Sequence, residues 1–400
     1  MKRLVVRTEA SDLPEDLTAA LGRPEGCAWI NGGDGLVGWG EAVRIAVAGP
    51  ARFEEARRHF ADLVEAAEVH DEVKVAGTGP VAFGAFTFDP ANQGSALVVP
   101  AIVVGRRGGV SWRTTIAEAE AAVPEASNDR VRYAGSSLPD ARWLEAVDEA
   151  AAAVRSGAIE KVVLARDVKV WTKRPLDLRP VLRRLAAAYP ECYTFAFEGL
   201  VGASPELLAR RMDDTVESVV LAGTARRGTT VEEDAALGED LLASAKDVAE
   251  HRPVSDEVRR VLEDITESLD VSAAPFLLRL ANAQHLATSF AGRLSQPRDA
   301  LEIAAMLHPT PAVCGTPTDR ALEMIGALEA MDRDLYAGPV GWVDGRGDGE
   351  WAVALRCARF RGSRGRLFAG AGIVAASRPE AELEETRLKL RAMQDALDVA

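Results

Sequence analysis

The chain has 400 residues, of which 48% are hydrophobic, and it carries a formal net charge of −14 at pH 7. This length and apolar content allow a large buried core. The acidic charge argues against nucleic acid as a partner, because no segment shows dense clustering of Lys and Arg. The first residues return to charge too soon for a signal peptide, and no uncharged apolar run reaches the roughly eighteen residues that a membrane helix needs. We therefore expect a cytoplasmic protein that does not span a membrane.

The four cysteines lie far apart in the chain and lack the CxxC spacing of metal and redox sites. They are Cys27, Cys192, Cys314 and Cys357. Small apolar thiols at scattered positions are typical of reduced, mostly buried cysteines. The sequence therefore predicts no disulfide and no thiol chemistry.

The N-terminal third carries few motifs. It has short β-like runs at 28–30, 81–86 and 96–104, and one strongly helical stretch at 50–69. A polar passage rich in Ser, Asn and Asp then reads as a connection between residues 125 and 139. We place the boundary there: an N-terminal segment, 1–137, is expected to complete the same fold as the motif-bearing region, 138–398.

The second region interleaves helices with strands that look antiparallel, without a regular βαβ repeat. This order predicts a large α+β architecture rather than a doubly wound sheet. The predicted elements are helix 140–156, strands 160–171, 192–198, 200–211 and 216–222, helix 178–189, a long helix 239–268, strand 276–294, helices 298–306 and 318–328, a hairpin 336–360, strand 366–375 and helix 379–398.

Three segments rich in Gly or Pro, each flanked by apolar runs, occur in the second region. They are Leu221–Gly228, Leu307–Pro317 and Ala369–Val374. Any one of them alone would more often be an ordinary turn. Backbone of this kind can fold closely around a small ligand, so together the three segments predict a pocket.

Acidic side chains are paired on two predicted helices. Asp247 and Glu250 are three residues apart and share a helix face, and Glu382, Glu385 and Lys389 follow the same logic. If the two helices pack together, the carboxylates repel one another unless a cation neutralises them. Oxygen ligands of this kind suit Mg²⁺. The alternative is that all these acids lie on solvated helix faces.

Two single residues are candidates for acid–base chemistry. Lys161 opens an apolar strand, where burial would lower its pKa and make it a usable general base. It could instead be an edge lysine that reaches water. Glu206 follows a proline and precedes another apolar strand, so apolar surroundings could keep its carboxyl protonated as a general acid. It could equally be a plain glutamate at the start of a strand.

Arg356 is predicted in the second strand of the hairpin, among apolar neighbours, where a buried guanidinium needs an anion such as a carboxylate. Tyr336 could offer its hydroxyl to the same anion or merely pack. His285 and His308 lack metal-ligand spacing, and such histidines more often orient a loop or complete a hydrogen bond in the core.

Taken together and in this order, these segments and residues resemble the chorismate-utilising enzymes over residues 140–395, and within that family most closely the isochorismate synthases. The resemblance implies one large α+β fold of the anthranilate synthase component I type, with two antiparallel sheets in a sandwich-like core surrounded by helices. It also implies a Mg²⁺-dependent site that binds the two carboxylates of chorismate.

The resemblance assigns roles to individual residues. It implies that Lys161 activates water for attack at C2 of the ring and that Glu206 protonates the departing C4 hydroxyl. It implies that Glu250 and Glu385 bind the metal, with Asp247 and Glu382 close by and acting through water. The residues implied to hold the substrate are Gly223, Thr224, His285, Tyr336, Leu355, Arg356, Gly370, Gly372 and Lys389.

A few positions discriminate within the family. Relatives that use ammonia generally lack a lysine at the position of Lys161, so we expect water as the nucleophile and no glutaminase subunit. Salicylate synthases share the lysine, the acid and the metal ligands, then eliminate pyruvate, but usually depart from the pattern seen at 308–315. A salicylate synthase is therefore the alternative. We expect a monomer or weak homodimer, and isochorismate could serve menaquinone or siderophore synthesis.

Overall fold

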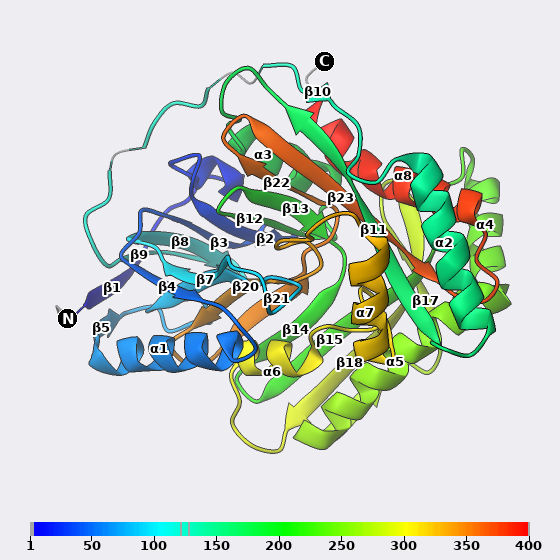
Figure 1. Cartoon of the computed structure of the whole chain (residues 1–400). Coiled ribbons are helices and arrows are strands. Elements are labelled where there is room, and N and C mark those ends of the chain that lie inside the picture. Colours follow the sequence, from blue (N-terminus) through cyan, green and yellow to red (C-terminus); the bar gives the residue numbers. More distant parts are fainter. Residues whose placement is uncertain (1–3, 121, 127–128, 399–400) are drawn as a thin grey trace.

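The computed structural model describes residues 4–120, 122–126 and 129–398, which build two large β-sheets with helices around them (Figure 1). The long strand pairs near the site are antiparallel, whereas β1 and β5 pair in parallel. This arrangement confirms the α+β class with two sheets that the sequence predicts. N-terminal strands enter both sheets, since β2 pairs with β12 and β6 pairs with β20.

The larger sheet has thirteen strands. Along its path they are β10 (Arg132–Tyr133), β11 (Lys161–Trp171), β23 (Arg364–Ile373), β22 (Cys357–Arg361), β13 (Leu200–Ser204), β12 (Tyr193–Phe197), β2 (Cys27–Asn31), β3 (Asp34–Trp39), β8 (Ile102–Arg107), β9 (Val110–Thr115), β1 (Val5–Ala10) and β5 (Glu68–Asp71), with β19 (Gly315–Thr316) paired to β11.

The smaller sheet has ten strands. In order they are β16 (Thr266–Val271), β18 (Ala283–Leu294), β15 (Thr215–Arg226), β14 (Leu207–Met212), β21 (Gly349–Val353), β20 (Pro339–Asp344), β6 (Val81–Ala85), β7 (Ser95–Val99) and β4 (Val43–Val47), with β17 (Phe276–Arg279) paired to β18.

The helices cover the outer faces and ends of the sheets (Figure 1). They are α1 (Arg52–Ala66), α2 (Asp140–Arg155), α3 (Arg179–Ala188), α4 (Val231–Ala243), α5 (Ala245–Ile265), α6 (Ala300–Leu307), α7 (Thr318–Leu328) and α8 (Pro379–Leu397), together with the short 3₁₀ helix η1 (Leu17–Ala20). For the part of the chain that the structure describes, none of these helices has the length and apolarity needed to cross a membrane.

The chain passes between the two sheets at places where the sequence predicts continuous strands. The run 96–104 divides at Pro100 into β7 and β8, and the strand 200–211 divides at Pro205 into β13 and β14. Proline has no N–H to donate to a strand ladder, so each proline ends one pairing and lets the chain join the other sheet. The predicted hairpin 336–360 is also wrong at its end, because β22 leaves the hairpin sheet for the larger one.

Two further predicted elements are wrong in their boundaries. The helix predicted at 239–268 is two helices that meet at Ser244, whose hydroxyl accepts a hydrogen bond from Asp247 N and caps α5. A side-chain cap of this kind starts a new helix. The strand predicted at 276–294 is the hairpin of β17 and β18, closed where Leu280 N donates to Ala283 O.

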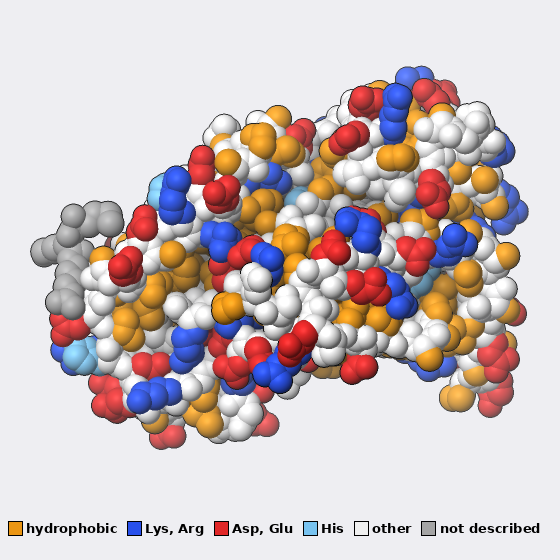
Figure 2. Space-filling model, turned by 90° about the horizontal axis from the view of Figure 1, so that it is seen from below, with side chains coloured by type: hydrophobic (Ala, Val, Ile, Leu, Met, Phe, Trp, Pro, Cys, Tyr) orange, Lys and Arg blue, Asp and Glu red, His pale blue; other side chains and the backbone are white. Residues whose placement is uncertain are grey.

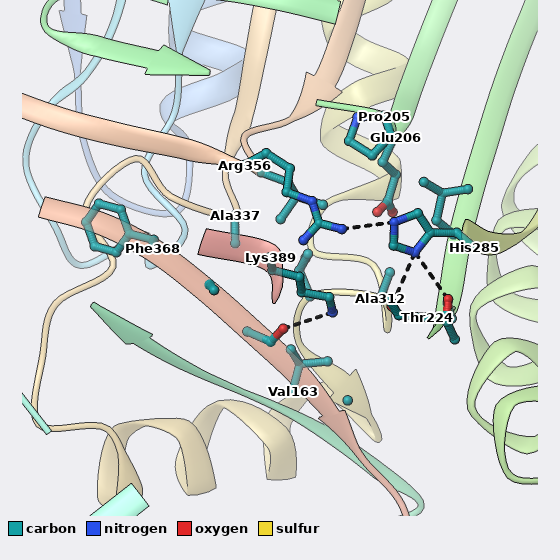
Figure 3. Close-up of a pocket in the computed structure, with 18 of the residues that line it drawn as sticks. Val163, Pro205, Glu206, Thr224, His285, Ala312, Ala337, Arg356, Phe368 and Lys389 are labelled. Atoms are coloured by element: carbon teal, nitrogen blue, oxygen red, sulfur yellow. Dashed lines mark hydrogen bonds between the residues drawn. The ribbon is translucent and has the colours of Figure 1, made fainter. Parts of the chain in front are cut away.

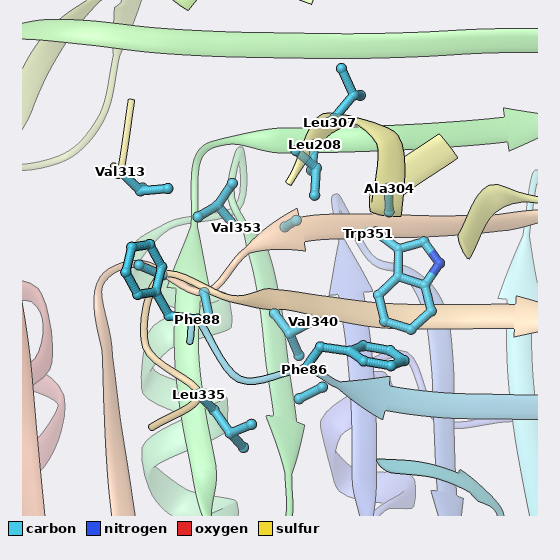
Figure 4. Packing of buried hydrophobic residues seen from close by; sticks show 14 of the residues in the cluster. Phe86, Phe88, Leu208, Ala304, Leu307, Val313, Leu335, Val340, Trp351 and Val353 are labelled. Carbon is cyan, nitrogen blue, oxygen red and sulfur yellow. The ribbon is translucent and has the colours of Figure 1, made fainter. Parts of the chain in front are cut away.

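The main core lies between the sheets and under α1 and α6, and it is rich in aromatic side chains (Figure 4). The ring of Phe86 stacks on Phe53 with centroids 4.3 Å apart and meets Trp351 at 5.7 Å. Each such ring buries a large apolar area, and aromatic pairs add roughly 0.5–1.5 kcal/mol beyond that burial. The four cysteines are buried and free, which confirms their predicted state.

Charged side chains of both signs alternate over the face of the molecule shown in Figure 2. Many arginines on the surface lie in ion pairs, as Arg57 does with Asp299 at 2.7 Å. On this face, acidic and basic side chains are therefore intermingled rather than gathered into one acidic region.

Candidate active site

A pocket opens beside the place where the chain crosses between the sheets (Figure 3). All three Gly/Pro-rich segments contribute to its wall, as their pattern predicts. The residues that line it are Val163, Pro205, Glu206, Leu221, Ala222, Gly223, Thr224, Glu250, His285, Ala312, Val313, Tyr336, Ala337, Leu355, Arg356, Phe368, Ala369, Gly370, Gly372 and Lys389.

Two crossings between the sheets run side by side and carry two of the candidate residues. One is the link from β13 to β14, which holds Glu206, and the other is the link from β21 to β22, which holds Arg356. Val353 N donates to Glu206 O at 3.2 Å, and Ala203 N donates to Arg356 O at 3.3 Å. These backbone bonds fix both side chains on the same side of the pocket.

Arg356 does not lie within a strand, which corrects its predicted position. It follows β21 with a φ of 47°, a left-handed conformation that non-glycine residues rarely adopt. Such strain often marks functional positions. The residue is only 9% exposed, and among the described residues its Nε has no hydrogen-bond partner and no carboxylate forms an ion pair with it. Burial accordingly lowers the pKa of the guanidinium.

His285 holds the other side of this guanidinium. Its Nε2 lies 2.9 Å from Arg356 Nη2, while its Nδ1 lies 3.2 Å from both Gly223 O and Thr224 Oγ1 (Figure 3). An arginine can only donate, so Nε2 accepts and the proton of the neutral ring resides on Nδ1. Burial, with Arg356 nearby, lowers the pKa of His285 well below its usual range. The ring therefore stays neutral.

Glu206 is a buried carboxyl that favours its protonated form. It is 2% exposed, and its Oε1 has no hydrogen-bond partner in the described part of the chain. Burial raises its pKa to about 8, although the positive charges of Lys161, Lys389 and Arg356 oppose this rise. A carboxyl in such a setting can donate a proton near neutral pH.

Lys161 lies directly behind the pocket wall rather than in it. It opens β11, is 1% exposed, and donates from Nζ to the backbone oxygen of Glu250 at 3.0 Å. Its Nζ also lies 3.7 Å from the Glu250 carboxylate. Burial lowers the pKa of this amine against the opposing effect of Glu250. The strand is thus buried at this end, and the edge-lysine alternative is wrong.

Acidic side chains of α5 and α8 come together at one place, because Glu250 on α5 interacts electrostatically with Glu385 on α8. Burial and the charge of Glu385 raise the pKa of Glu250 to about 7, although Lys161 opposes the rise. Burial and Glu385 likewise raise the pKa of Glu382. The alternative in which these glutamates sit on solvated helix faces is therefore wrong for Glu250 and Glu382, which are 5% and 1% exposed.

Each of these carboxylates is paired with a lysine in the structure. Lys389 Nζ lies 2.5 Å from Glu385 Oε1 and donates to Gly370 O at 3.0 Å, and Lys246 Nζ lies 2.7 Å from Glu382 Oε1. The pKa of Glu385 is lowered, because Lys389 outweighs the opposite effect of burial. Asp247 stands apart, half-buried in the first turn of α5, where it bonds with the capping Ser244.

The donor set fits a hard divalent cation in its chemistry. It consists of carboxylate oxygens that repel one another, and glycine backbone leaves room beside them, since a Cβ at Gly372 would lie 2.1 Å from Glu250 Oε1. No three Asp, Glu, His or Cys side chains of the described chain are grouped as metal ligands, and lysines form ion pairs with Glu385 and Glu382. A cation would have to replace these ion pairs.

The remaining wall of the pocket is apolar and backbone-rich. The Tyr336 ring stacks on Phe368 with centroids 5.0 Å apart, and a Cβ at Gly370 would lie 3.1 Å from the Tyr336 hydroxyl oxygen. Gly223 forms a bulge in β15 at a φ of 81°, which turns its backbone toward the pocket. This shape suits a small ring that carries anionic groups.

Sequence reasoning missed several wall residues and one charged neighbour. Val163 lies two residues after Lys161 on β11, and Phe368 directly precedes Ala369 on β23, so alternation along these strands could have found them. Lys246 was missed although it directly precedes Asp247. A positive charge in the first turn of a helix interacts unfavourably with the helix dipole. This unfavourable position was the feature of the sequence that could have indicated a role for Lys246.

Comparison with known proteins agrees with this geometry. The family model described as "Chorismate binding enzyme" matches residues 30–123 and 109–398. Isochorismate synthase EntC of Escherichia coli is 39% identical over 327 residues, which cover 78% of this chain and 80% of that protein. Isochorismate synthase DhbC of Bacillus subtilis is 43% identical over 265 residues, 63% of this chain and 67% of that protein.

The fold is similar to that of a solved relative. The menaquinone-specific isochorismate synthase MenF from Escherichia coli superposes with a TM-score of 0.81 at 26% identity, covering 99% of this chain and 95% of that one. The chain therefore belongs to the chorismate-binding enzyme family and, within it, groups with the isochorismate synthases.

Proposed function

We propose that the protein is an isochorismate synthase, an isomerase that converts chorismate to isochorismate. The observation that carries the proposal is the pairing of two buried groups with opposite pKa shifts at one pocket. Lys161 has a lowered pKa and Glu206 a raised one. Both groups therefore favour the uncharged form more than the same groups would if they were exposed to water. An uncharged amine can accept a proton while an uncharged carboxyl donates one.

Lys161 and Glu206 carry out the two proton transfers of the reaction. The neutral amine of Lys161 accepts a proton from water as the water oxygen forms a bond to C2 of the ring. The double bonds shift, the C4–O bond breaks, and Glu206 gives its proton to the departing hydroxyl, which leaves as water. One water enters and one leaves, so the product is an isomer of the substrate.

Substrate binding follows from the charges of the pocket. Chorismate carries two carboxylates, and two cationic groups line the pocket, Arg356 from the link between β21 and β22 and Lys389 from α8. A planar guanidinium binds a carboxylate through two parallel hydrogen bonds. Backbone N–H groups near Gly223, Thr224, Gly370 and Gly372 can donate further hydrogen bonds to the substrate carboxylates. Tyr336 and Leu355 would pack on the ring. His285 aims Arg356.

We further propose that Mg²⁺ is required. Glu250 and Glu385 would hold it, with Asp247 and Glu382 nearby through water. The ion would supply a fixed positive charge that binds a substrate carboxylate and offsets the repulsion among the glutamates. Residues 138–398 would form the catalytic region, while 1–137 complete the sheets.

We expect the enzyme to work without a glutaminase subunit, as a monomer or weak homodimer in the cytoplasm. Its product would enter menaquinone or siderophore synthesis.

The test is a product analysis with purified protein and chorismate, with and without Mg²⁺ and without ammonia. Chromatography separates isochorismate from salicylate and pyruvate. Mg²⁺-dependent isochorismate without pyruvate is the expected result. Equal amounts of salicylate and pyruvate would instead identify a salicylate synthase, and no turnover of chorismate would refute the proposal.

A further inference from the structure

Lys246 occupies a position that the helix itself does not favour. It lies in the first turn of α5, directly after the start of the helix at Ala245. The amino end of a helix carries partial positive charge, so a lysine there is unfavourable by a few tenths of a kcal/mol or more. Another interaction must explain its orientation.

That interaction is the ion pair between Lys246 on α5 and Glu382 on α8. The Nζ to Oε1 distance is 2.7 Å, and it is the one hydrogen bond that Lys246 makes among the described residues. The Glu382 side chain is 1% exposed, whereas that of Lys246 is 29% exposed. The lysine thus reaches inward from solvent to neutralise a carboxylate whose burial as an isolated charge would be costly.

Lys246 differs in this from the other two lysines of the cluster. Lys161 is fully buried against Glu250, and Lys389 lines the pocket while it binds Gly370 O. Lys389 can therefore contact a bound substrate, while Lys161 lies directly behind the pocket wall without a path to solvent. Lys246 does not line the pocket and retains a path to solvent, so it can leave its carboxylate without disturbing the pocket wall.

We propose that Lys246 is a displaceable counter-ion of the cation site: it neutralises Glu382 in the metal-free protein and withdraws to solvent when a divalent cation binds. The proposal rests on the proposed function, in which Glu382 lies beside the Mg²⁺ ligands. Mg²⁺ and the ammonium group of Lys246 would repel each other if both lay beside Glu382. Mg²⁺ therefore competes with an ammonium group that the chain itself supplies.

Two consequences follow for a variant without this charge. Loss of the ammonium removes repulsion toward Mg²⁺, so the metal binds more tightly. It also leaves Glu382 buried without its lysine, so the metal-free protein becomes less stable and regains more stability when Mg²⁺ binds. A lysine that served only to hold Glu382 in a metal-binding position would have the opposite effect on metal affinity.

The experiment measures Mg²⁺ binding to the full chain by calorimetry, without chorismate, together with thermal melting at zero and saturating Mg²⁺. For Lys246→Gln we expect affinity at least about ten-fold tighter than wild type and a larger Mg²⁺-induced rise in Tm. Lys246→Arg keeps the charge and should resemble wild type. Lys173→Gln, an exposed lysine beyond the far end of β11, controls for net charge. Unchanged or weaker affinity in Lys246→Gln overturns the proposal.

A second measurement needs no variant and covers the case in which Lys246→Gln fails to fold. Acetylation of Lys246 in the wild-type protein is followed by mass spectrometry, with Lys173 as the reference. Mg²⁺ should accelerate the modification of Lys246 relative to Lys173, and an unchanged or slower rate overturns the proposal. Product analysis with chorismate tests the enzymatic function separately, since displacement without isochorismate formation would refute only that function.

Discussion

The Nη2 atom of Arg356 donates to Nε2 of His285 at 2.9 Å, so a buried guanidinium is held by a neutral histidine rather than by a carboxylate. The arrangement leaves the positive charge of Arg356 for a ligand. The histidine is itself fixed through Nδ1 at Gly223 O. The pair is therefore oriented before a substrate arrives.

His285→Ala should weaken substrate binding more than it slows chemistry. The change frees one N–H of Arg356 and leaves it buried without an acceptor, at a cost of about 1–3 kcal/mol. We expect the KM for chorismate to rise about ten-fold or more, with a smaller change in kcat. Steady-state kinetics check this, and His70→Ala is the matched control because His70 is exposed on β5. An unchanged KM would contradict the role of His285.

Lys161→Ala should abolish isochorismate formation, with kcat reduced by about 10²–10⁴-fold or more. The variant also loses the hydrogen bond from Lys161 Nζ to Glu250 O, but Glu250 stays on α5, so the circular dichroism spectrum and the binding of Mg²⁺ in the absence of substrate should persist. Chromatographic detection of the product measures the loss. Near-normal turnover in this variant would exclude Lys161 as the base.

The pH dependence of kcat/KM should show a falling limb that belongs to Glu206. The general acid must carry its proton, and burial raises its pKa to about 8. Activity is therefore retained below about pH 8 and lost as the pH rises through that value. Protonation of Lys161 should produce the opposite, rising limb, since the base must be neutral, and burial moves this limb below the pH at which an ordinary lysine would titrate. Initial rates across the pH range give both limbs.

Glu206→Gln provides the control for this assignment. The amide cannot donate the proton, so kcat/KM should fall by about 10²–10⁴-fold, and the residual rate should no longer decline above about pH 8. If the falling limb persists in Glu206→Gln, another group is the source of that limb.

Glu250→Gln should raise the Mg²⁺ concentration required for half-maximal activity by about 10-fold or more, because it removes a charged oxygen ligand. Titration of activity against Mg²⁺ measures this requirement. Glu257→Gln is the comparison, since Glu257 lies farther along α5 and pairs with Arg260 on the exposed face. Equal metal requirements in the two variants would remove Glu250 from the ligand set.

Local pattern was sufficient to predict the α+β class, most helices and the segments that wall the pocket. The helical period of 379–398 and the apolar run that begins at Lys161 are visible in a few neighbouring residues, and they correspond closely to α8 and β11. The Gly/Pro-rich segments were also recognisable, because their backbone requirements are local.

Only the tertiary structure decided which sheet each strand joins. A run such as 200–211 has one continuous apolar pattern, yet its two halves pair with partners more than a hundred residues away in different sheets. The same holds for Arg356, whose place between sheets depends on such long-range pairing, and for Lys246, whose partner Glu382 lies on another helix. Sequence pattern reports the chemistry of each residue, whereas burial and ion pairing depend on contacts between distant segments.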